Sequence, residues 1–242
     1  MKLPGFLKRP TRPSSQLDGE LRREIRLSFD EAARDEEHFP STIDPRIQHV
    51  QVLVRFFAPI LNATAVSRLP GAATAVGRLS GAATAVGRLL DVGCGKGRYA
   101  RVLLDSNPAA RVRITGLDIS EQMLRSVPEG IGKVSGIMTD LPFAGESFDG
   151  IYATESLEHA VDIERAIAEM CRVLRPGGRL AIIDKNAEQW GRMKTPAWER
   201  WFNRRELEKL LARHCRSVRS EPISYWEDVA PDGLFLAWFA EK

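Results

Sequence analysis

The sequence has little cysteine, no clustered histidine and no long apolar run. Its three cysteines, Cys94, Cys171 and Cys215, are odd in number and form no CxxC pair, so neither a disulfide framework nor a structural zinc site is indicated. The four histidines are too scattered for an HExxH site. No apolar stretch approaches the roughly 18 residues that span a bilayer, and proline and basic residues interrupt the N-terminus where a signal peptide needs its apolar segment. These absences predict a cytoplasmic protein with no stable membrane insertion.

An excess of charge of one sign is also missing, since 35 basic residues face 32 acidic ones and the formal net charge is +3. The four basic residues Lys2, Lys8, Arg9 and Arg12 precede the first acid, so the rest of the chain is nearly balanced. A balanced body lacks the broad positive field of a nucleic-acid-binding domain, so a nucleic-acid partner is not favoured. The composition, 43% hydrophobic and 28% charged, excludes collagen-like and wholly disordered chains.

The part of the chain before residue 88 divides into three segments. Residues 1–16 are rich in proline and basic residues and are expected to form a mobile basic arm. Apolar residues recur at helical spacing in 18–33 and 47–60, so an N-terminal helical segment is expected over 17–67. Residues 68–87 hold two decamers, RLPGAATAVG and RLSGAATAVG, which differ at one position. Each decamer is short and broken by glycine, so we interpret the tandem repeat as a surface connection rather than a repeat array.

Residues 88–242 alternate between short apolar runs and amphipathic stretches, which is typical of an α/β domain. Strands are expected at 89–92, 112–117, 133–138, 148–153, 179–184 and, antiparallel to the others, 234–239. Helices are expected at 98–104, 121–127, 163–174 and 206–214. The alternation predicts a mostly parallel sheet with helices on both faces, and such sheets bind ligands at the carboxyl ends of their strands.

A glycine-rich turn, Asp91-Val-Gly93-Cys94-Gly95-Lys-Gly97, directly follows the first of these strands and precedes a helix. Glycines at such a turn let a ligand approach the backbone, and the helix N-terminus offers free amide groups. Arg98 stands where GxGxxG requires its third glycine, and the Gly-Lys pair is not followed by Ser or Thr. Neither the dinucleotide fingerprint nor the P-loop pattern is therefore met.

Further motifs follow the next strands in order. Asp118, in GLDIS, comes about twenty residues after the glycines, the spacing at which an acid binds ribose hydroxyls. The later motifs are TDLPF at 139–143, SFDGIYATESLEH at 147–159 and LRPGGRLAIID at 174–184.

This ordered set, from about Leu89 to Asp184, resembles the class I S-adenosylmethionine-dependent methyltransferases, and in particular the small-molecule methyltransferases of ubiquinone and menaquinone biosynthesis. The resemblance implies a Rossmann-like, doubly wound, mostly parallel seven-stranded sheet with an antiparallel last strand and an N-terminal helical extension that acts as a lid. It implies S-adenosylmethionine as the cofactor. The implied cofactor-binding residues are Asp91, Gly93, Cys94, Gly95 and Gly97 at the methionine part, Asp118 and Ile119 at the ribose and adenine, Asp140 and Leu141 at the adenine amine, and Thr154 and Glu155 near the methyl end.

The ExxEH sequence at Glu155, Glu158 and His159 can gather two carboxylates and an imidazole at the opening of a helix. Such a trio suits a divalent metal and resembles the metal site of the ubiquinone-biosynthesis O-methyltransferases and of small-RNA 2′-O-methyltransferases. Similar sequences occur in family members that use no metal, and no second cluster of ligands is visible in this chain. We therefore assign no metal ligands and take Glu158 and His159 as the catalytic candidates, with an acid-base, an orienting or a purely structural role open for His159.

Residues 186–205 occupy the place where the family inserts acceptor-binding elements, the acceptor being the molecule that receives the methyl group. Four aromatic residues there could form a wall or lid, and five basic residues could hold a carboxylate or phosphate: Trp190, Trp198, Trp201 and Phe202, and Arg192, Lys194, Arg200, Arg204 and Arg205. Alternatively the aromatics cap the core and the charges form a solvated helix face.

The resemblance predicts a biosynthetic enzyme that methylates a small-molecule or carrier-linked acceptor, with oxygen favoured and nitrogen and carbon open. Two rival functions remain at this stage. The basic and aromatic stretch 190–219 would suit an RNA or tRNA methyltransferase. A catalytically silent methyltransferase fold could instead serve as a partner subunit.

Overall fold

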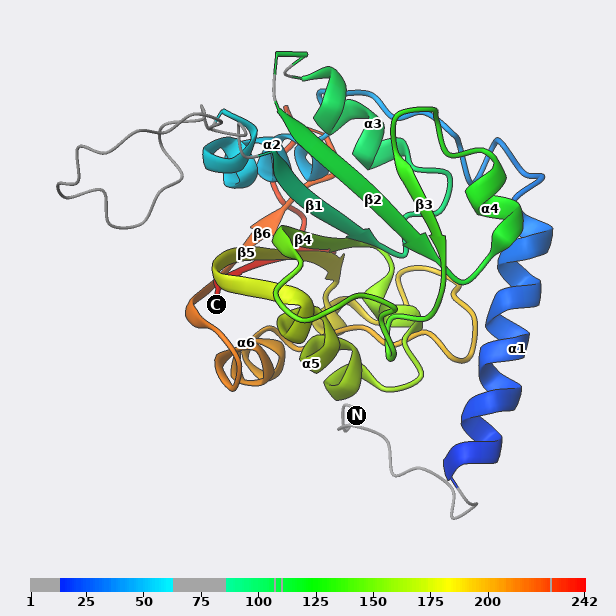
Figure 1. Cartoon of the computed structure of the whole chain (residues 1–242). Helices are drawn as coiled ribbons and strands as arrows, with labels where there is room; N and C mark the ends of the chain where they lie inside the picture. Colours follow the sequence, from blue (N-terminus) through cyan, green and yellow to red (C-terminus); the bar gives the residue numbers. More distant parts are fainter. Residues whose placement is uncertain (1–13, 63–85, 107, 110, 227) are drawn as a thin grey trace, which may run out of the picture.

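A computed structural model describes residues 14–62, 86–106, 108–109, 111–226 and 228–242 (Figure 1). The first helix begins at Ser14, inside the segment expected to be a mobile arm, and residues 1–13 of that arm lie outside the described residues. The decamer repeat also lies outside them, apart from its last two residues.

Seven strands form one sheet in the order β3-β2-β1-β4-β5-β7-β6. Their bounds are Gly87–Val92 for β1, Val112–Asp118 for β2, Gly132–Ser135 for β3, Phe148–Thr154 for β4, Leu174–Lys185 for β5, Arg216–Ile223 for β6 and Phe235–Glu241 for β7. The pairs among β1 to β5 are parallel, and β7 lies antiparallel between β5 and β6. The predicted Rossmann-like sheet with an antiparallel last strand is thereby confirmed.

The order of the strands reverses at β1, which has β2 on one side and β4 on the other. At such a switch point the connections after the two neighbouring strands leave toward opposite faces, and a crevice opens at the carboxyl ends. The glycine turn after β1 stands at this point of the sheet.

Helices cover both faces of the sheet, as the alternation predicted. Their bounds are Ser14–Ala32 for α1, Gln48–Leu61 for α2, Arg98–Asp105 for α3, Glu121–Arg125 for α4, Ile163–Val173 for α5 and Arg204–Ala212 for α6, with 3₁₀ turns at Leu157–His159 (η1) and Ala187–Gln189 (η2). One apolar cluster joins α2 and α3 to the sheet and the other joins α5 and α6. Successive side chains of β4 pack on opposite faces of the sheet: Ile151 lies in the apolar cluster with α5, and Tyr152 lies in the cluster with α2.

Helix α1 lies apart from both layers, beyond the carboxyl ends of the parallel strands and beside α4 (Figure 1). Only Ile25 is buried among its described side chains, so this helix contributes little to the core. Among the described residues, no helix combines the length and the apolar character needed to cross a bilayer.

Candidate active site

A cavity of about 650 Å³ lies at the carboxyl ends of β1, β2 and β4, beneath α1. Its volume is in the range of small-molecule pockets. The parts of the chain that line it include the glycine turn, the end of β2, the segment after β4, and residues 193–196, 198 and 199 of the expected acceptor insertion. Helix α1 closes it with Arg22, Ile25, Ser28 and Phe29.

The glycine turn adopts a backbone that only glycine adopts easily. Gly93, Gly95 and Gly97 have φ angles of +73°, +53° and +77°. A Cβ on Gly93 would lie 2.5 Å from the Cβ of Ser156, whereas a Cβ on Gly95 would meet no atom within 4 Å. Gly93, Cys94 and Gly95 line the cavity. The turn therefore presents bare backbone to open space at Gly95.

Asp118 ends β2 and joins that strand to the glycine turn. Its Oδ2 accepts a hydrogen bond from the Gly95 N–H at 2.8 Å, and its Oδ1 accepts one from the Ser120 N–H at 2.8 Å. Burial raises the pKa of Asp118 while these N–H donors oppose the rise. Asp118 and Ile119 both line the cavity, and a carboxylate with two accepted bonds still has lone pairs for ligand hydroxyls.

Four residues assigned to the cofactor do not line the cavity. Asp91 is buried beneath the turn, where burial, aided by the Asp118 charge, raises its pKa to about 8. Gly97 caps α3 and packs against Val127. Asp140 is exposed, and Leu141 is buried in the core with its N–H donating to the Glu169 carboxylate. Residues 136–139 line the cavity in their place.

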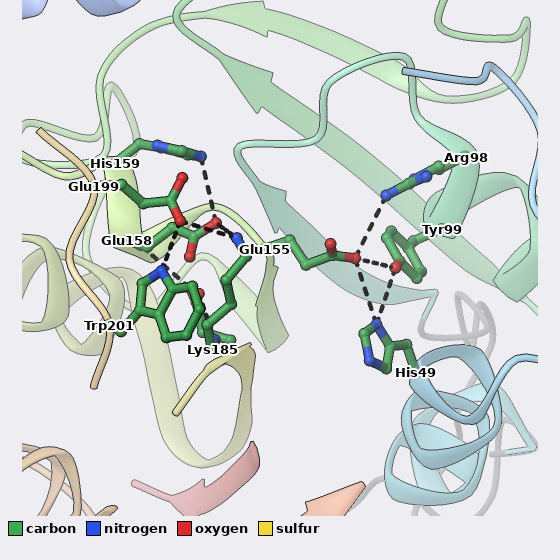
Figure 2. Close-up of polar contacts among 10 residues, drawn as sticks. His49, Arg98, Tyr99, Glu155, Glu158, His159, Lys185, Glu199 and Trp201 are labelled. Atoms are coloured by element: carbon green, nitrogen blue, oxygen red, sulfur yellow. Dashed lines mark hydrogen bonds and ion pairs between the residues drawn. The ribbon is translucent and has the colours of Figure 1, made fainter. Parts of the chain in front are cut away.

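Thr154, at the end of β4, and Glu155, directly after it, line the cavity. Thr154 is buried, and its hydroxyl has no hydrogen-bond partner among the residues that the structure describes. Glu155, at φ +51°, accepts a hydrogen bond from the Tyr99 hydroxyl at 2.9 Å. It also faces His49 Nδ1 at 3.4 Å and Arg98 Nη2 at 3.5 Å (Figure 2). Burial alone would raise the pKa of Glu155, but contact with His49, Arg98 and Tyr99 lowers it to about 2.

This arrangement corrects the expectation that Glu155, Glu158 and His159 gather at one mouth. Figure 2 shows Glu155 directed toward α2 and α3, away from the other two side chains. The positive φ at Glu155 turns the chain between β4 and η1, and His49 and Tyr99 then hold its carboxylate. His49 carries only a weak signal in the sequence, since a histidine on the apolar face of a helix indicates a buried polar contact.

Glu158 and His159 instead join a second group of side chains, formed with Lys185, Glu199 and Trp201 (Figure 2). The Lys185 ammonium contacts Glu158 Oε1 and lies 3.2 Å from Glu199 Oε1. The Trp201 Nε1–H donates to the same Glu199 oxygen at 2.8 Å, and His159 Nε2 lies 3.5 Å from Glu158 Oε1. Glu158, Lys185 and Glu199 are all buried, so one ammonium faces two carboxyl groups, and burial together with the neighbouring Asp184 carboxylate raises the pKa of Glu158.

His159 stands between this group and the helix above the cavity. The Phe29 ring of α1 meets its ring edge to face, with 5.0 Å between centroids. Burial and the Lys185 charge lower the pKa of His159 to about 3, so the imidazole is neutral near pH 7. Its Nδ1 is buried without a hydrogen-bond partner within the described part of the chain.

The segment predicted to bind the acceptor divides in two. Residues 193–196, Trp198 and Glu199 line the cavity, and the buried Trp198 Nε1 has no hydrogen-bond partner in the described ranges. Trp201 and Phe202 are buried in the body of the protein, whereas Trp190 is 52% exposed. Of the basic residues, Lys194 lines the cavity, Arg192 pairs with Asp232 and Arg204 bonds to Ser220. The one segment therefore contributes some side chains to the cavity wall and others to the core.

Comparison with known proteins agrees with this geometry. Residues 90–182 match the family described as "Methyltransferase domain". An O-methyltransferase, resE, of Aspergillus sclerotiorum is 46% identical over 82 residues, which is 30% of this chain and 31% of that protein. A demethylmenaquinone methyltransferase of Mycobacterium sp. (strain KMS) is 38% identical over 103 residues, which is 42% of this chain and 40% of that protein. The match therefore spans under half of each of these relatives.

Among solved structures, the fold is similar to that in a complex between the Haloferax volcanii Trm112 methyltransferase activator and a methyltransferase. The TM-score is 0.62 at 17% identity, over 90% of this chain and 96% of that one. At this identity the likeness concerns the fold alone. The matched residues 90–182, which include the glycine turn, thus resemble a methyltransferase domain, and they lie in the Rossmann-like fold of the class I S-adenosylmethionine-dependent methyltransferases.

Proposed function

We propose that this chain transfers the methyl group of S-adenosylmethionine to a small-molecule acceptor, with an oxygen atom as the favoured site of methylation. The observation that carries the proposal is one continuous cavity, which extends from the glycine turn and Asp118 to His159, Lys185 and Trp198. A cofactor at one end and an acceptor at the other would share it.

The residues at the glycine end suit S-adenosylmethionine. This cofactor carries hydroxyl and amine donors and no phosphate, so it needs acceptors such as Asp118 and bare backbone such as that of Gly95. Thr154, with its free buried hydroxyl, is a further candidate contact. When bound, the cofactor supplies an electrophilic methyl group on sulfur. The protein's tasks are then to align the acceptor with that methyl group and to exclude water.

The other end suits an acceptor with an apolar body. Phe29, Phe39, Met193 and Trp198 line it, and α1 covers it. A covered pocket favours a small molecule over a folded macromolecule. The relatives titled O-methyltransferase and demethylmenaquinone methyltransferase support this class of acceptor. The pocket is also compatible with a carrier-linked acceptor, because the carrier would remain outside the pocket and only the attached group would enter it.

The RNA alternative receives less support. Arg192 and Arg204, two of the basic residues that motivated it, are held by Asp232 and Ser220. These two side chains are therefore less available to bind the phosphates of an RNA. The cytoplasmic location remains part of the proposal and is supported by the three cysteines, which are all free thiols.

Calorimetry with S-adenosylmethionine tests the cofactor half. Asp118→Ala should weaken binding by about 1 to 3 kcal/mol, because it removes charge-assisted hydrogen bonds in a buried site. Asp162→Ala is the matched control, since Asp162 also accepts a backbone N–H, from Arg165, but lies outside the cavity lining. Equal affinities for the wild type and Asp118→Ala would remove Asp118 from the site.

A product screen tests the acceptor half. Isotope-labelled S-adenosylmethionine is offered with phenolic and quinol acceptors and, in parallel, with transfer RNA. Label in an organic extract supports the proposal, and label in RNA overturns it. Cofactor binding with no labelled product from cell extract would favour the silent partner subunit.

A further inference from the structure

The side-chain atoms of Glu158, His159 and Glu199 have the spacing of a metal site. One oxygen or nitrogen from each lies within 4.8 Å of the others, and two of the three residues are buried. The Oε2 of Glu158 is buried without a hydrogen-bond partner among the described residues. Judged by these three residues alone, a divalent cation would fit.

A fourth residue changes this conclusion, because the Lys185 ammonium lies against both carboxylates. It contacts Glu158 Oε1 and is 3.2 Å from Glu199 Oε1 (Figure 2). The Trp201 N–H donates to that same Glu199 oxygen. A metal ion at the centre of the set would stand beside a buried positive charge and would lose ligand oxygens to it. The set therefore does not fit a divalent metal while Lys185 is in place.

The position of Lys185 is fixed by the backbone on both sides. Asp184 accepts hydrogen bonds from the N–H of Lys185 at 2.9 Å and from the N–H of Glu158 at 3.1 Å. One buried carboxylate thus ties the end of β5 to η1, and so sets the ammonium beside the glutamate. A charged group held in this way needs no rearrangement when a ligand arrives.

We propose that Lys185 is the resident cation of the acceptor site and holds the acceptor oxygen there, at the place that Glu158, His159 and Glu199 alone would offer to a divalent metal. An ammonium has three N–H donors; one is donated to Glu158 Oε1, and Glu199 Oε1, at 3.2 Å from the nitrogen, can accept a second. Lys185 also lines the cavity, where the third donor can meet a ligand. A hydroxyl or enolate oxygen accepts such a bond, and the ammonium favours its anionic form. The inference rests on the proposed function and narrows it to oxygen acceptors.

Cobalt binding tests the inference without any activity assay. Wild-type protein titrated with Co²⁺ should show no visible absorption bands from bound metal, whereas Lys185→Met should bind Co²⁺ at least tenfold more tightly. The added substitution Glu199→Gln should weaken that binding again, because it removes one ligand. Lys185→Arg is the matched control, since it keeps the charge and should bind no more Co²⁺ than the wild type.

The same titration has an outcome that would contradict the inference. Tight Co²⁺ binding by the wild type that is lost in Glu199→Gln would overturn the inference, and this comparison remains available if Lys185→Met does not fold. Calorimetry with S-adenosylmethionine on the same samples separates the two proposals. A wild type that fails to bind the cofactor contradicts the proposed function. A Lys185→Met variant that binds the cofactor but methylates an oxygen acceptor at the wild-type rate contradicts only the role of Lys185.

Discussion

At the scale of single residues, Gly95 and Gly130 allow the cost of a strained backbone to be measured separately from the loss of space for the cofactor. Gly95 and Gly130 have φ of +53° and +86°, and a Cβ on either would meet no atom within 4 Å. Alanine should cost each site about 1 to 2 kcal/mol of stability through the left-handed backbone. Only Gly95→Ala should also weaken S-adenosylmethionine binding, by tenfold or more, because only Gly95 lines the cavity. Thermal melts and calorimetry on both variants give the comparison, and an equal affinity loss in both would contradict the assignment.

Glu155 should make stability depend on pH in the acid range. Its folded-state pKa is lowered from 4.5 to about 2, so its contribution is present above pH 4.5 and is lost as the pH falls toward 2. Glu155→Gln should therefore destabilise the protein at pH 7 by about 1 to 3 kcal/mol, and the difference from the wild type should shrink below pH 4.5. Urea unfolding at a series of pH values measures it.

Glu146→Gln is the control for this experiment. Glu146 has a similar φ of +60°, but its side chain is exposed. We expect little difference from the wild type at any pH. A Glu155→Gln difference that stays constant from pH 7 to pH 3 would show that the carboxylate charge does not hold this contact.

The site was predictable from the sequence where strand ends fix the residues and less so where loops do. Asp118 and Thr154 end β2 and β4, and parallel strands bring such ends together at one edge of the sheet. Asp140 follows β3 within a loop, whose direction no periodicity determines, and it is exposed. No sequence pattern singles out Lys185, because its partner Glu199 returns to it through an irregular segment.

At the scale of elements, β6 is the strand that the sequence did not predict. The buried strands read as apolar runs and were expected within a few residues of their bounds. Strand β6 is RSVRSEPI at the edge of the sheet, and only its last residue is buried. Polar side chains suit an exposed edge and leave no hydrophobic pattern to detect. The expected helix 163–174 and strand 179–184 leave Pro176-Gly177-Gly178 between them, whereas β5 includes these residues in its first part, before its regular pairing with β4 from Arg179.

Helix α1 is held over the cavity by few contacts, which makes its attachment testable. The Ser120 hydroxyl donates to Asp30 Oδ1 at 2.7 Å, and Arg22 reaches Thr139 at 3.4 Å. Asp30→Ala should loosen α1 while the core is preserved. We expect hydrogen exchange in α1 to rise and S-adenosylmethionine to dissociate several-fold faster, with little change in the global unfolding free energy.

The neighbouring residue supplies the control for α1. Glu31 is exposed, and Glu31→Ala should change neither hydrogen exchange in α1 nor the dissociation rate. Unchanged dissociation from Asp30→Ala would mean that α1 does not act as a lid. The N-terminal extension would then be a support for the fold only.

At the scale of the whole molecule, the decamer duplication predicts a tolerated deletion. Removing Arg78–Gly87 leaves Gly77 in front of Arg88, so the first residue of β1 is again glycine. Helix α2 packs on the sheet through its own buried residues, such as Leu53 and Phe57. The shorter connection should change mainly the closure entropy, by about 0.6 kcal/mol per twofold change in length. Melting temperature and cofactor affinity should stay close to those of the parent, and a melting point lower by about ten degrees would contradict this.

Two tryptophans, Trp198 and Trp201, are placed so that intrinsic fluorescence can detect binding at the acceptor end of the cavity. Trp198 lines it, and Trp201 is joined through Glu199 to Lys185. Trp238, by contrast, is fully buried in the sheet and bonded to the Arg204 carbonyl, so its emission should be a constant background. An acceptor that reaches Lys185 should therefore change the fluorescence through Trp198 and Trp201, and Trp198→Phe should remove most of that signal. Unlabelled protein in a fluorimeter would then be enough to rank candidate acceptors before any product is identified.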